Sequence, residues 1–305
     1  MFSEENTIVN INMDIVKIFF NFISDHFLKR QKYKKTASEY GLLLYFCALK
    51  KKVSDFDEVN VMTNPEKNGL NIAVVLAGGS GQRFGAAIPK QFLPLAGRTV
   101  IEYSVEAFEH CEDIDEIAVV MHPDYLAQMQ AIIDKNGWKK VKKLLPGGAE
   151  RYFSTLAALN AYENTDHVNL IFHDAARPAV SQRIIKETVT ALETHSAVAV
   201  AVPATDTVFE VTEDGGFITG IPSRKRLRCA QTPQAFRIDV IREAYRKALS
   251  DPDFSSTDDC GVLHKYCPEI PIFIVPGDTS NIKLTYPGDT EILERILTGA
   301  SENEN

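Results

Sequence analysis

The chain lacks several features that mark common functional classes. Its five cysteines include no Cys-x-x-Cys pair, which disfavours a zinc site and indicates reduced thiols. Its net charge of −8 disfavours binding to nucleic acid through a basic surface. The apolar run 42–49 is too short to span a bilayer, and the N-terminus lacks the pattern of a secretory signal. We therefore expect a cytoplasmic protein with no nucleic-acid partner and no stable membrane insertion.

Two well-known glycine-loop motifs are also missing. No Gly-Lys-Ser/Thr follows Gly78 at the spacing of a Walker loop. A dinucleotide fingerprint needs glycines at its first, third and sixth places, and the glycines here do not fall there: Gly78, Gly79, Gly81 and Gly85. The sequence therefore indicates neither a P-loop nucleotidase nor a dinucleotide-binding enzyme.

A different glycine-rich loop is present at 76–85, directly after the apolar segment 72–76. A strand that ends in such a turn exposes backbone N–H groups with no side chains to obstruct a ligand. Arg83 and Lys90, the latter within Pro-Lys-Gln-Phe, add two cations. Glycines alone could serve the geometry of a turn, but with these cations they favour a polyphosphate ligand.

Strand-like and helix-like segments alternate from residue 71 onward. Strands are expected at 72–76, 116–121, 141–145, 169–172, 198–202 and 270–275, and helices at 100–109, 125–136, 152–162, 182–195 and 287–298. This alternation predicts an α/β fold, a Rossmann-like and mostly parallel sheet with helices on both faces. Ligands of such sheets bind beyond the carboxyl ends of the strands, so the glycine loop and Asp174 are expected to face one cleft.

Two segments depart from the alternation. Residues 208–228 predict a protruding β-arm, because strand-like runs flank Asp214-Gly215-Gly216. Residues 1–70 form an N-terminal extension that is expected to be helical or partly disordered and non-catalytic. A membrane-surface helix, or translation from a start upstream of the true one, are the alternatives there. The catalytic domain is then expected at 71–305.

Several motifs occur together and in a fixed order. They are the glycine loop with Pro89–Phe92, then Gly147–Arg151, His173–Pro178, Gln231–Phe236, Thr257–Cys260 and Asn281–Thr285. From about residue 71 to 297 the chain resembles the CTP-dependent cytidylyltransferases that activate ribitol 5-phosphate or methylerythritol phosphate. The resemblance implies the nucleotide-diphospho-sugar transferase type of fold, CTP and a small polyol phosphate as substrates, Mg²⁺ as cofactor, and a homodimer formed through the β-arm.

The same resemblance assigns site residues. Arg83, Lys90 and Lys283 are implied to be catalytic, stabilising charge on the triphosphate and the α-phosphate. The implied nucleotide-binding residues are Leu76, Ala77, Gly78, Gly79, Gly147, Gly148 and Ser154. The implied substrate-binding residues are Asp174, Arg177, Thr205, Arg224 and Thr232. Asp174 is also the candidate ligand for Mg²⁺, together with the CTP phosphates. His173 is expected to pack or to orient the loop rather than to act as a base, and Cys260 is expected to pack rather than to act as a nucleophile.

The identity of the acceptor depends on a few positions near the β-arm. Methylerythritol-phosphate enzymes usually carry a basic residue before an Asp-Thr pair, where this chain has Thr205, and commonly a threonine where it has Ile221. Arg224, Lys225 or Arg228 could supply the missing cation. The resemblance favours ribitol 5-phosphate, which gives CDP-ribitol, a precursor of cell-wall or capsule polymers. The alternative is 2-C-methyl-D-erythritol 4-phosphate, in isoprenoid biosynthesis.

Two other classes remain as competing hypotheses. A sugar 1-phosphate nucleotidyltransferase that uses UTP or GTP shares the glycine loop, but the His-Asp-Ala-Ala-Arg-Pro and Asn-Ile-Lys motifs disfavour it. A nucleotide-sensing protein without activity would have little reason to keep Arg83, Lys90, Asp174 and Lys283 together.

Overall fold

The computed structural model describes residues 69–79, 88–148, 150–165 and 167–299. The chain divides into two units, 1–64 and 65–305, and all the described residues belong to the second. Residues 1–68 of the predicted N-terminal extension, and Arg83, therefore lie outside the described residues, and what was expected of them stays a prediction. Within the described part of the chain, no helix is long and apolar enough to cross a membrane.

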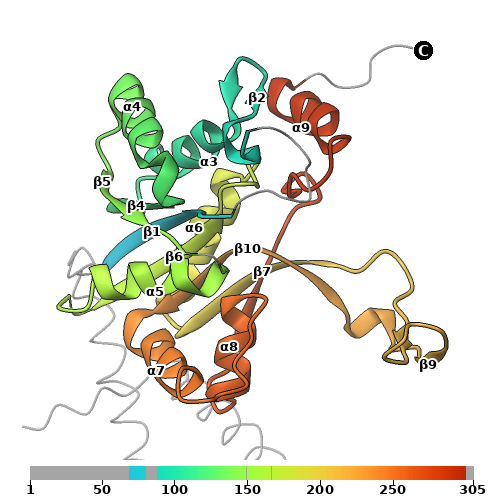
Figure 1. Cartoon of the computed structure of the whole chain (residues 1–305). Coiled ribbons are helices and arrows are strands. Elements are labelled where there is room, and N and C mark those ends of the chain that lie inside the picture. The colour runs from blue at the N-terminus through green and yellow to red at the C-terminus, as the bar shows by residue number, and fades with distance from the viewer. Residues whose placement is uncertain (1–68, 80–87, 149, 166, 300–305) are drawn as a thin grey trace, which may run out of the picture. The chain divides into compact units, whose positions relative to one another are not determined.

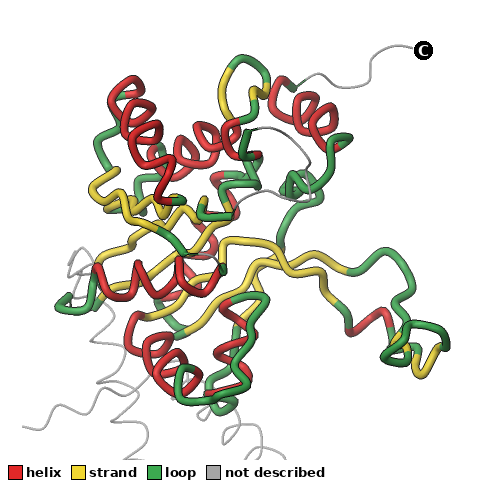
Figure 2. The backbone as a smooth tube through the Cα atoms, in the orientation of Figure 1, coloured by secondary structure: helices red, strands yellow, loops and turns green. Residues whose placement is uncertain are grey.

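A seven-stranded sheet forms the centre of the fold, in the order β11-β7-β10-β6-β1-β4-β5 (Figures 1 and 2). Its strands are β1 (Leu70–Ala77), β4 (Glu116–Met121), β5 (Val141–Pro146), β6 (Val168–Asp174), β7 (Ala197–Pro203), β10 (Arg228–Arg237) and β11 (Phe273–Pro276). Every pairing is parallel except those of β10, which runs antiparallel to β6 and β7. The predicted mostly parallel α/β sheet is confirmed.

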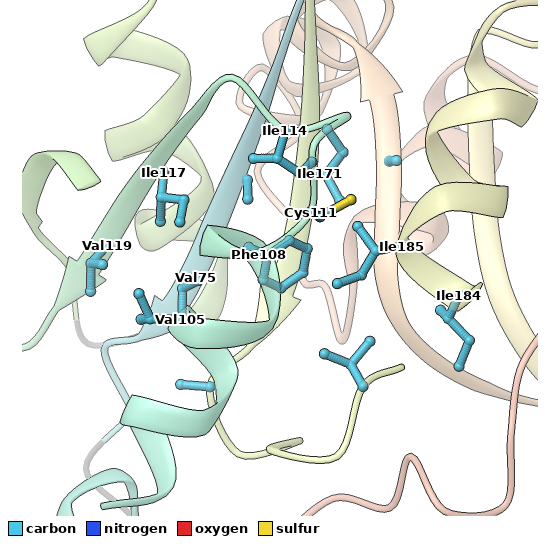
Figure 3. Close-up of a cluster of buried hydrophobic side chains, with 14 of the residues drawn as sticks. Val75, Val105, Phe108, Cys111, Ile114, Ile117, Val119, Ile171, Ile184 and Ile185 are labelled. Atoms are coloured by element: carbon cyan, nitrogen blue, oxygen red, sulfur yellow. The ribbon is translucent and has the colours of Figure 1, made fainter. Parts of the chain in front are cut away.

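Helices cover both faces of this sheet because its central strands are apolar on both sides. On β1, Val75 belongs to one buried cluster and Val74 to another, as the two-residue repeat of a strand requires. The first cluster contains residues of α3 (Val100–Glu109), α4 (Leu126–Asn136) and α6 (Gln182–Leu192). Figure 3 shows Phe108 of α3 among Val75, Ile171 and Ile185 in that cluster.

The second cluster joins the other face to α5 (Arg151–Ala161), α7 (Ile238–Ala248) and α8 (Asp259–Tyr266). A smaller buried cluster contains Leu293, Leu95 and Leu284. It packs α9 (Asp289–Thr298) against the region of the short strands β2 (Pro94–Leu95) and β3 (Arg98–Thr99). Short 3-10 turns occur at η2 (Lys90–Phe92), η3 (Pro123–Tyr125) and η4 (Arg224–Arg226).

Several predicted boundaries are accurate, and besides the two-residue strands β2 and β3 three longer elements were missed. The helix 100–109 and the strand 116–121 agree with α3 and β4, whereas the helix predicted to reach residue 195 ends at Leu192. The longer missed elements are β10, α7 and α8. Strand β10 is interrupted by a shift of register between Ala230 and Gln234, around Pro233, which has no N–H to pair.

The predicted β-arm is present and leaves the sheet between β7 and β10 (Figure 1). It contains a small antiparallel hairpin of β8 (Glu210–Val211) and β9 (Ile218–Gly220). Gly215 in its turn has a φ of +73°, a conformation that favours glycine. Five large apolar side chains of the arm are at least half exposed: Phe209, Val211, Phe217, Ile218 and Ile221.

Candidate active site

The predicted cleft begins where β1 and β6 end side by side. Leu76 lies opposite Asp174 in their parallel register, and the N–H of Ala175 donates to the carbonyl of Leu76. Both ends are carboxyl ends, so the first glycines of the loop and the His-Asp motif lie at one edge of the sheet. The remainder of the loop, including Arg83, lies outside the described residues.

Three of the predicted nucleotide-binding residues meet closely at this edge. A Cβ atom on Gly78 would lie 2.7 Å from the Oγ of Ser154, and one on Gly147 would lie 2.9 Å from the same atom. Ser154 comes from α5 and is buried. A side chain at 78 or 147 would therefore force the Ser154 hydroxyl to move, whereas a Cβ on Gly79 would meet no atom within 4 Å. Gly148 also lies close, against Phe153.

Gln91 holds the first part of the loop in place. Its buried amide donates to the carbonyl of Ala77 at 2.9 Å and to that of Gly79 at 3.5 Å. The neighbouring Lys90 donates to the carbonyl of Leu284 at 3.2 Å, which places its ammonium beside the Asn-Ile-Lys motif. Sequence reasoning missed the role of Gln91, although the residue belongs to the Pro-Lys-Gln-Phe run that was singled out.

Asp174 lies between two cations. Its carboxylate is 2.6 Å from the ammonium of Lys283 and 3.7 Å from Nε of Arg151. Burial would raise the pKa of Asp174, but the charges of Lys283 and Arg151 hold it below its ordinary value. The carboxylate is therefore ionised at neutral pH. Its ion-pair partners are thus Lys283 and Arg151, whereas Arg177, implied by the resemblance to bind substrate, donates to the carbonyls of Asn281 and Ala230.

Arg151 is anchored from behind by a second carboxylate. Its Nη1 donates to Asp259 at 2.7 Å, and Asp259 is fully buried. The hydroxyls of Thr155 and Tyr245 donate to the other oxygen of Asp259. Burial would lower the pKa of Arg151, but Asp259 and Asp174 raise it above its ordinary value. Two motifs singled out by their order, Gly147–Arg151 and Thr257–Cys260, are thus joined by an ion pair that the sequence did not reveal.

Cys260, beside this ion pair, is kept as a thiol. Burial raises its pKa well above the ordinary value, and the charges of Asp258 and Asp259 add to that effect. A thiol in this state is a poor nucleophile, in keeping with the packing role expected of it.

Four side chains close a ring of hydrogen bonds beneath Asp174, which we call the hydrogen-bond ring. Its members are His173, Arg177, Asn281 and Thr232. Arg177 donates to the carbonyl of Asn281 at 2.7 Å, and the amide of Asn281 donates to the carbonyl of Thr232 at 2.9 Å. The ring joins three of the ordered motifs. It also fixes Asp174, which directly follows His173, and Lys283, which lies two residues after Asn281.

Thr205 and Arg224 lie apart from these residues, at the base of the β-arm and within it. The guanidinium of Arg224 donates to the carbonyl of Thr205 at 2.7 Å, and both residues are exposed. Among the described residues, neither shares a hydrogen bond or ion pair with Asp174 or Lys283. One copy of the chain therefore brings two of the predicted substrate residues together without joining them to the rest of the site.

The donor set suits a metal held mainly by substrate. The described residues contain no group of three His, Cys, Asp or Glu side chains that could enclose an ion. Mg²⁺ usually keeps several waters and binds through one or two carboxylates plus substrate phosphates. Asp174, ionised and at the end of β6, fits that pattern as a single protein ligand.

Comparisons with known proteins agree with this geometry. The model of the family IspD, 2-C-methyl-D-erythritol 4-phosphate cytidylyltransferase, matches residues 71–299. The chain belongs to this family. A 2-C-methyl-D-erythritol 4-phosphate cytidylyltransferase of Thermobifida fusca is 48% identical over 235 residues, which cover 75% of this chain and 94% of that protein.

Two further similarities are informative. A bifunctional ribulose 5-phosphate reductase/CDP-ribitol pyrophosphorylase of Haemophilus influenzae is 38% identical over 76% of this chain, although the match covers 49% of that longer protein. The crystal structure of 4-diphosphocytidyl-2C-methyl-D-erythritol synthase from Anaerococcus prevotii matches with a TM-score of 0.66 and 26% identity, over 76% of this chain and 97% of that one.

Membership of the IspD family confirms the class of enzyme that the ordered motifs imply. The chain is a cytidylyltransferase that acts on a polyol phosphate, with CTP as the nucleotide. The family therefore favours a cytidylyltransferase over the two competing hypotheses, a sugar 1-phosphate nucleotidyltransferase and an inactive nucleotide sensor.

Proposed function

We propose that this cytidylyltransferase transfers the cytidylyl group of CTP to 2-C-methyl-D-erythritol 4-phosphate and releases pyrophosphate. The observation that carries the proposal is the 48% identity to the Thermobifida fusca enzyme over 94% of its length. The sequence analysis favoured ribitol 5-phosphate, and that acceptor is the second candidate. It is supported by Thr205 in place of a basic residue and by the Haemophilus influenzae relative.

The reaction needs no nucleophile from the protein. An oxygen of the acceptor phosphate forms the new bond to the α-phosphorus of CTP, while the bond from that phosphorus to the bridging oxygen breaks and pyrophosphate leaves. Because both substrates are polyanions, the protein's task is to hold them in line and to offset negative charge. The cations around Asp174 and the glycine loop suit that task.

Lys283 is proposed to make the central contact with the α-phosphate. In the structure its ammonium lies on Asp174 at 2.6 Å, at the carboxyl end of β6. A phosphate that enters beside Asp174 offers a second anion to the same three N–H donors. Lys283 thus bridges Asp174 and the α-phosphate, and Lys90, on the carbonyl of Leu284, reaches the nucleotide from the neighbouring segment. Arg83 is proposed to act with Lys90 on the triphosphate.

The nucleoside is proposed to lie against the glycines. Gly78 and Gly147 approach Ser154 so closely that a base or ribose can reach backbone groups of both segments. Leu76 and Ala77, at the end of β1, are proposed to contact the nucleoside together with Gly79 and Gly148. When bound to the CTP phosphates and Asp174, Mg²⁺ would lower their mutual repulsion.

The β-arm is proposed to complete the site of a second copy of the chain. Phe209, Phe217, Ile218 and Ile221 leave a row of apolar side chains exposed on the arm. Such a row is stable in water when another protein surface covers it. A homodimer that exchanges arms would also carry Thr205 and Arg224 to the acceptor side of the partner's Asp174. The polyol would then be bound between Arg177 and Thr232 of one copy and the arm of the other.

The test measures pyrophosphate release from CTP with 2-C-methyl-D-erythritol 4-phosphate, with ribitol 5-phosphate and with no acceptor. We expect turnover with the first to exceed that with the second by at least about 100-fold in kcat/KM, since a pocket built to pair a substrate's polar groups rejects a poor match strongly. Faster turnover with ribitol 5-phosphate would reverse the order of the two candidates. No turnover with either would overturn the proposal.

A further inference from the structure

His173 is a buried imidazole that the proposed reaction does not use. It is the second-last residue of β6 and has no exposed surface. Its ring packs beside that of Phe108, with centroids 5.2 Å apart. Each ring nitrogen nevertheless has a polar partner: Nε2 lies 3.0 Å from the carbonyl of Arg177, and Nδ1 lies 3.1 Å from Oγ1 of Thr232.

The two partners determine where the proton of the ring sits. A carbonyl oxygen can only accept a hydrogen bond, so Nε2 must carry hydrogen and donate to Arg177. The ring is fully buried beside Phe108 and neither of its hydrogen-bond partners is a carboxylate, so it is neutral and holds one proton. Nδ1 is then a bare acceptor.

The hydroxyl of Thr232 is fixed by the same argument. Because Nδ1 is bare, the single hydrogen of the hydroxyl must point to it. The backbone N–H of Asp174 donates to Oγ1 at 3.1 Å and occupies one of its two lone pairs. One lone pair is left, so toward any further group Oγ1 can accept a hydrogen bond and cannot donate one.

We infer that His173 is a positioning residue: as the Nε2–H tautomer it makes the Thr232 hydroxyl a pure hydrogen-bond acceptor and, through the Arg177 carbonyl, closes the hydrogen-bond ring that places Asp174 and Lys283. The inference deepens the proposed function in one respect. An acceptor-only oxygen suits a hydroxyl of the polyol and repels an oxygen of its phosphate. Thr232 therefore sets which end of the polyol phosphate lies at β6 and β10.

The tautomer is tested by NMR of protein with ¹⁵N-labelled histidine, without any substrate. The sequence contains seven histidines, and the His173→Asn variant identifies the resonances of residue 173 by their loss. We expect Nε2 to resonate as a protonated nitrogen and Nδ1 as a bare one at pH 7. A protonated Nδ1 would overturn the inference, whether or not the proposed acceptor is correct.

Kinetics with matched variants test the positioning role. In His173→Asn the side-chain oxygen can lie where Nδ1 was and accept from Thr232. In His173→Gln the amide nitrogen can reach the Arg177 carbonyl, but nothing near Thr232 accepts its hydrogen. We expect KM for the polyol phosphate to rise about tenfold in His173→Gln and about threefold or less in His173→Asn, with KM for CTP within about twofold in both.

Thr232→Val supplies the second arm of the experiment, with Thr188→Val as its control. Thr188 is equally buried, and its hydroxyl bonds only within α6, to the carbonyl of Ile184 at 2.7 Å. We expect Thr232→Val to raise the polyol KM about tenfold, His173→Gln to add little to it, and Thr188→Val to leave it unchanged.

Equal losses in His173→Asn and His173→Gln, or additive losses in the double variant, would show a merely structural histidine and overturn the positioning role. If no polyol phosphate is turned over at all, the proposed function fails while the NMR result still decides the tautomer.

Discussion

The sheet end of the site and the β-arm are built in opposite ways. At the sheet end, His173, Thr232 and Asn281 are buried and joined in a closed ring of hydrogen bonds. In the arm, Arg224 and Thr205 are exposed and joined by one hydrogen bond. The contrast indicates that the phosphate chemistry depends on residues that the fold fixes. Recognition of the polyol depends partly on residues that the fold of one copy leaves open.

The largest effect is expected at the fixed end, from Lys283→Ala. Loss of the ammonium removes a charge from the reacting phosphate and leaves Asp174, now without its 2.6 Å partner, to repel the substrates. We expect kcat to fall by about 10³-fold or more, as measured by pyrophosphate release, because such contacts act mainly in the transition state. A decrease in kcat of tenfold or less would show that the reacting phosphate does not lie beside Asp174 and Lys283.

The buried ion pair between Arg151 and Asp259 should contribute more to the free energy of unfolding than any residue of the arm. Asp259→Asn removes the 2.7 Å carboxylate partner of the buried Arg151 and leaves it only the more distant Asp174, so we expect a loss of about 3 kcal/mol in the free energy of unfolding by urea. Glu187→Gln is the control, since its pair with Arg183 lies on the exposed face of α6 and should cost below about 1 kcal/mol. Similar losses for the two variants would contradict the buried ion pair.

The arm should govern assembly rather than stability of the fold. In Phe217→Ser/Ile221→Ser, two side chains that are 74% and 62% exposed become polar. We expect the dimer to dissociate at least about tenfold more readily in sedimentation equilibrium, with the polyol KM raised in parallel. Leu249→Ser, exposed at the end of α7, is the control and should change neither. If the wild-type protein were a monomer with full activity, the arm would have no part in the active site.

A pH-dependent effect is expected from Glu102, a carboxylate outside the hydrogen-bond ring. Burial would raise its pKa, but hydrogen bonds from Thr99, Asn136 and Lys135 lower it to about 2. A carboxyl whose pKa is lowered in the folded state stabilises the protein above its unfolded pKa. This stability is lost as the pH falls toward 2.

Glu102→Gln should therefore lower the free energy of unfolding by on the order of 2 kcal/mol at pH 7. This difference between variant and wild type should shrink as the pH falls from 4.5 toward 2. Urea unfolding at a series of pH values measures both curves. A difference that does not depend on pH would show that the charge of Glu102 contributes nothing.

Much of the fold was predictable because its central strands are continuous apolar runs and the helices between them are periodic. The strand 116–121 and the helix 100–109 were predicted with the bounds that the structure has. Helix α7 was missed although its buried residues Ile238, Ile241 and Tyr245 follow helical spacing. Strand β10 was harder to predict, since Pro233 and its polar neighbours interrupt the strand pattern.

The site was predictable as a set of residues but not as a set of contacts. The order of the motifs brought out Asp174, Lys283, Arg151 and Asp259. Which cation pairs with which carboxylate depends on how α5, α8 and β6 pack, and no local pattern encodes it. The pairing of Asp174 with Lys283 and Arg151 was therefore not predicted. The roles of His173 and Gln91 depend in the same way on segments that lie close only in the folded chain.

The central claim is that this cytidylyltransferase uses 2-C-methyl-D-erythritol 4-phosphate. The most direct test gives the protein CTP, Mg²⁺ and equal concentrations of that acceptor and ribitol 5-phosphate, and follows both cytidine diphosphate products by ³¹P NMR and mass spectrometry. The account predicts that 4-diphosphocytidyl-2-C-methyl-D-erythritol and pyrophosphate accumulate together and that CDP-ribitol stays below about a hundredth of the product. CDP-ribitol as the main product would contradict it.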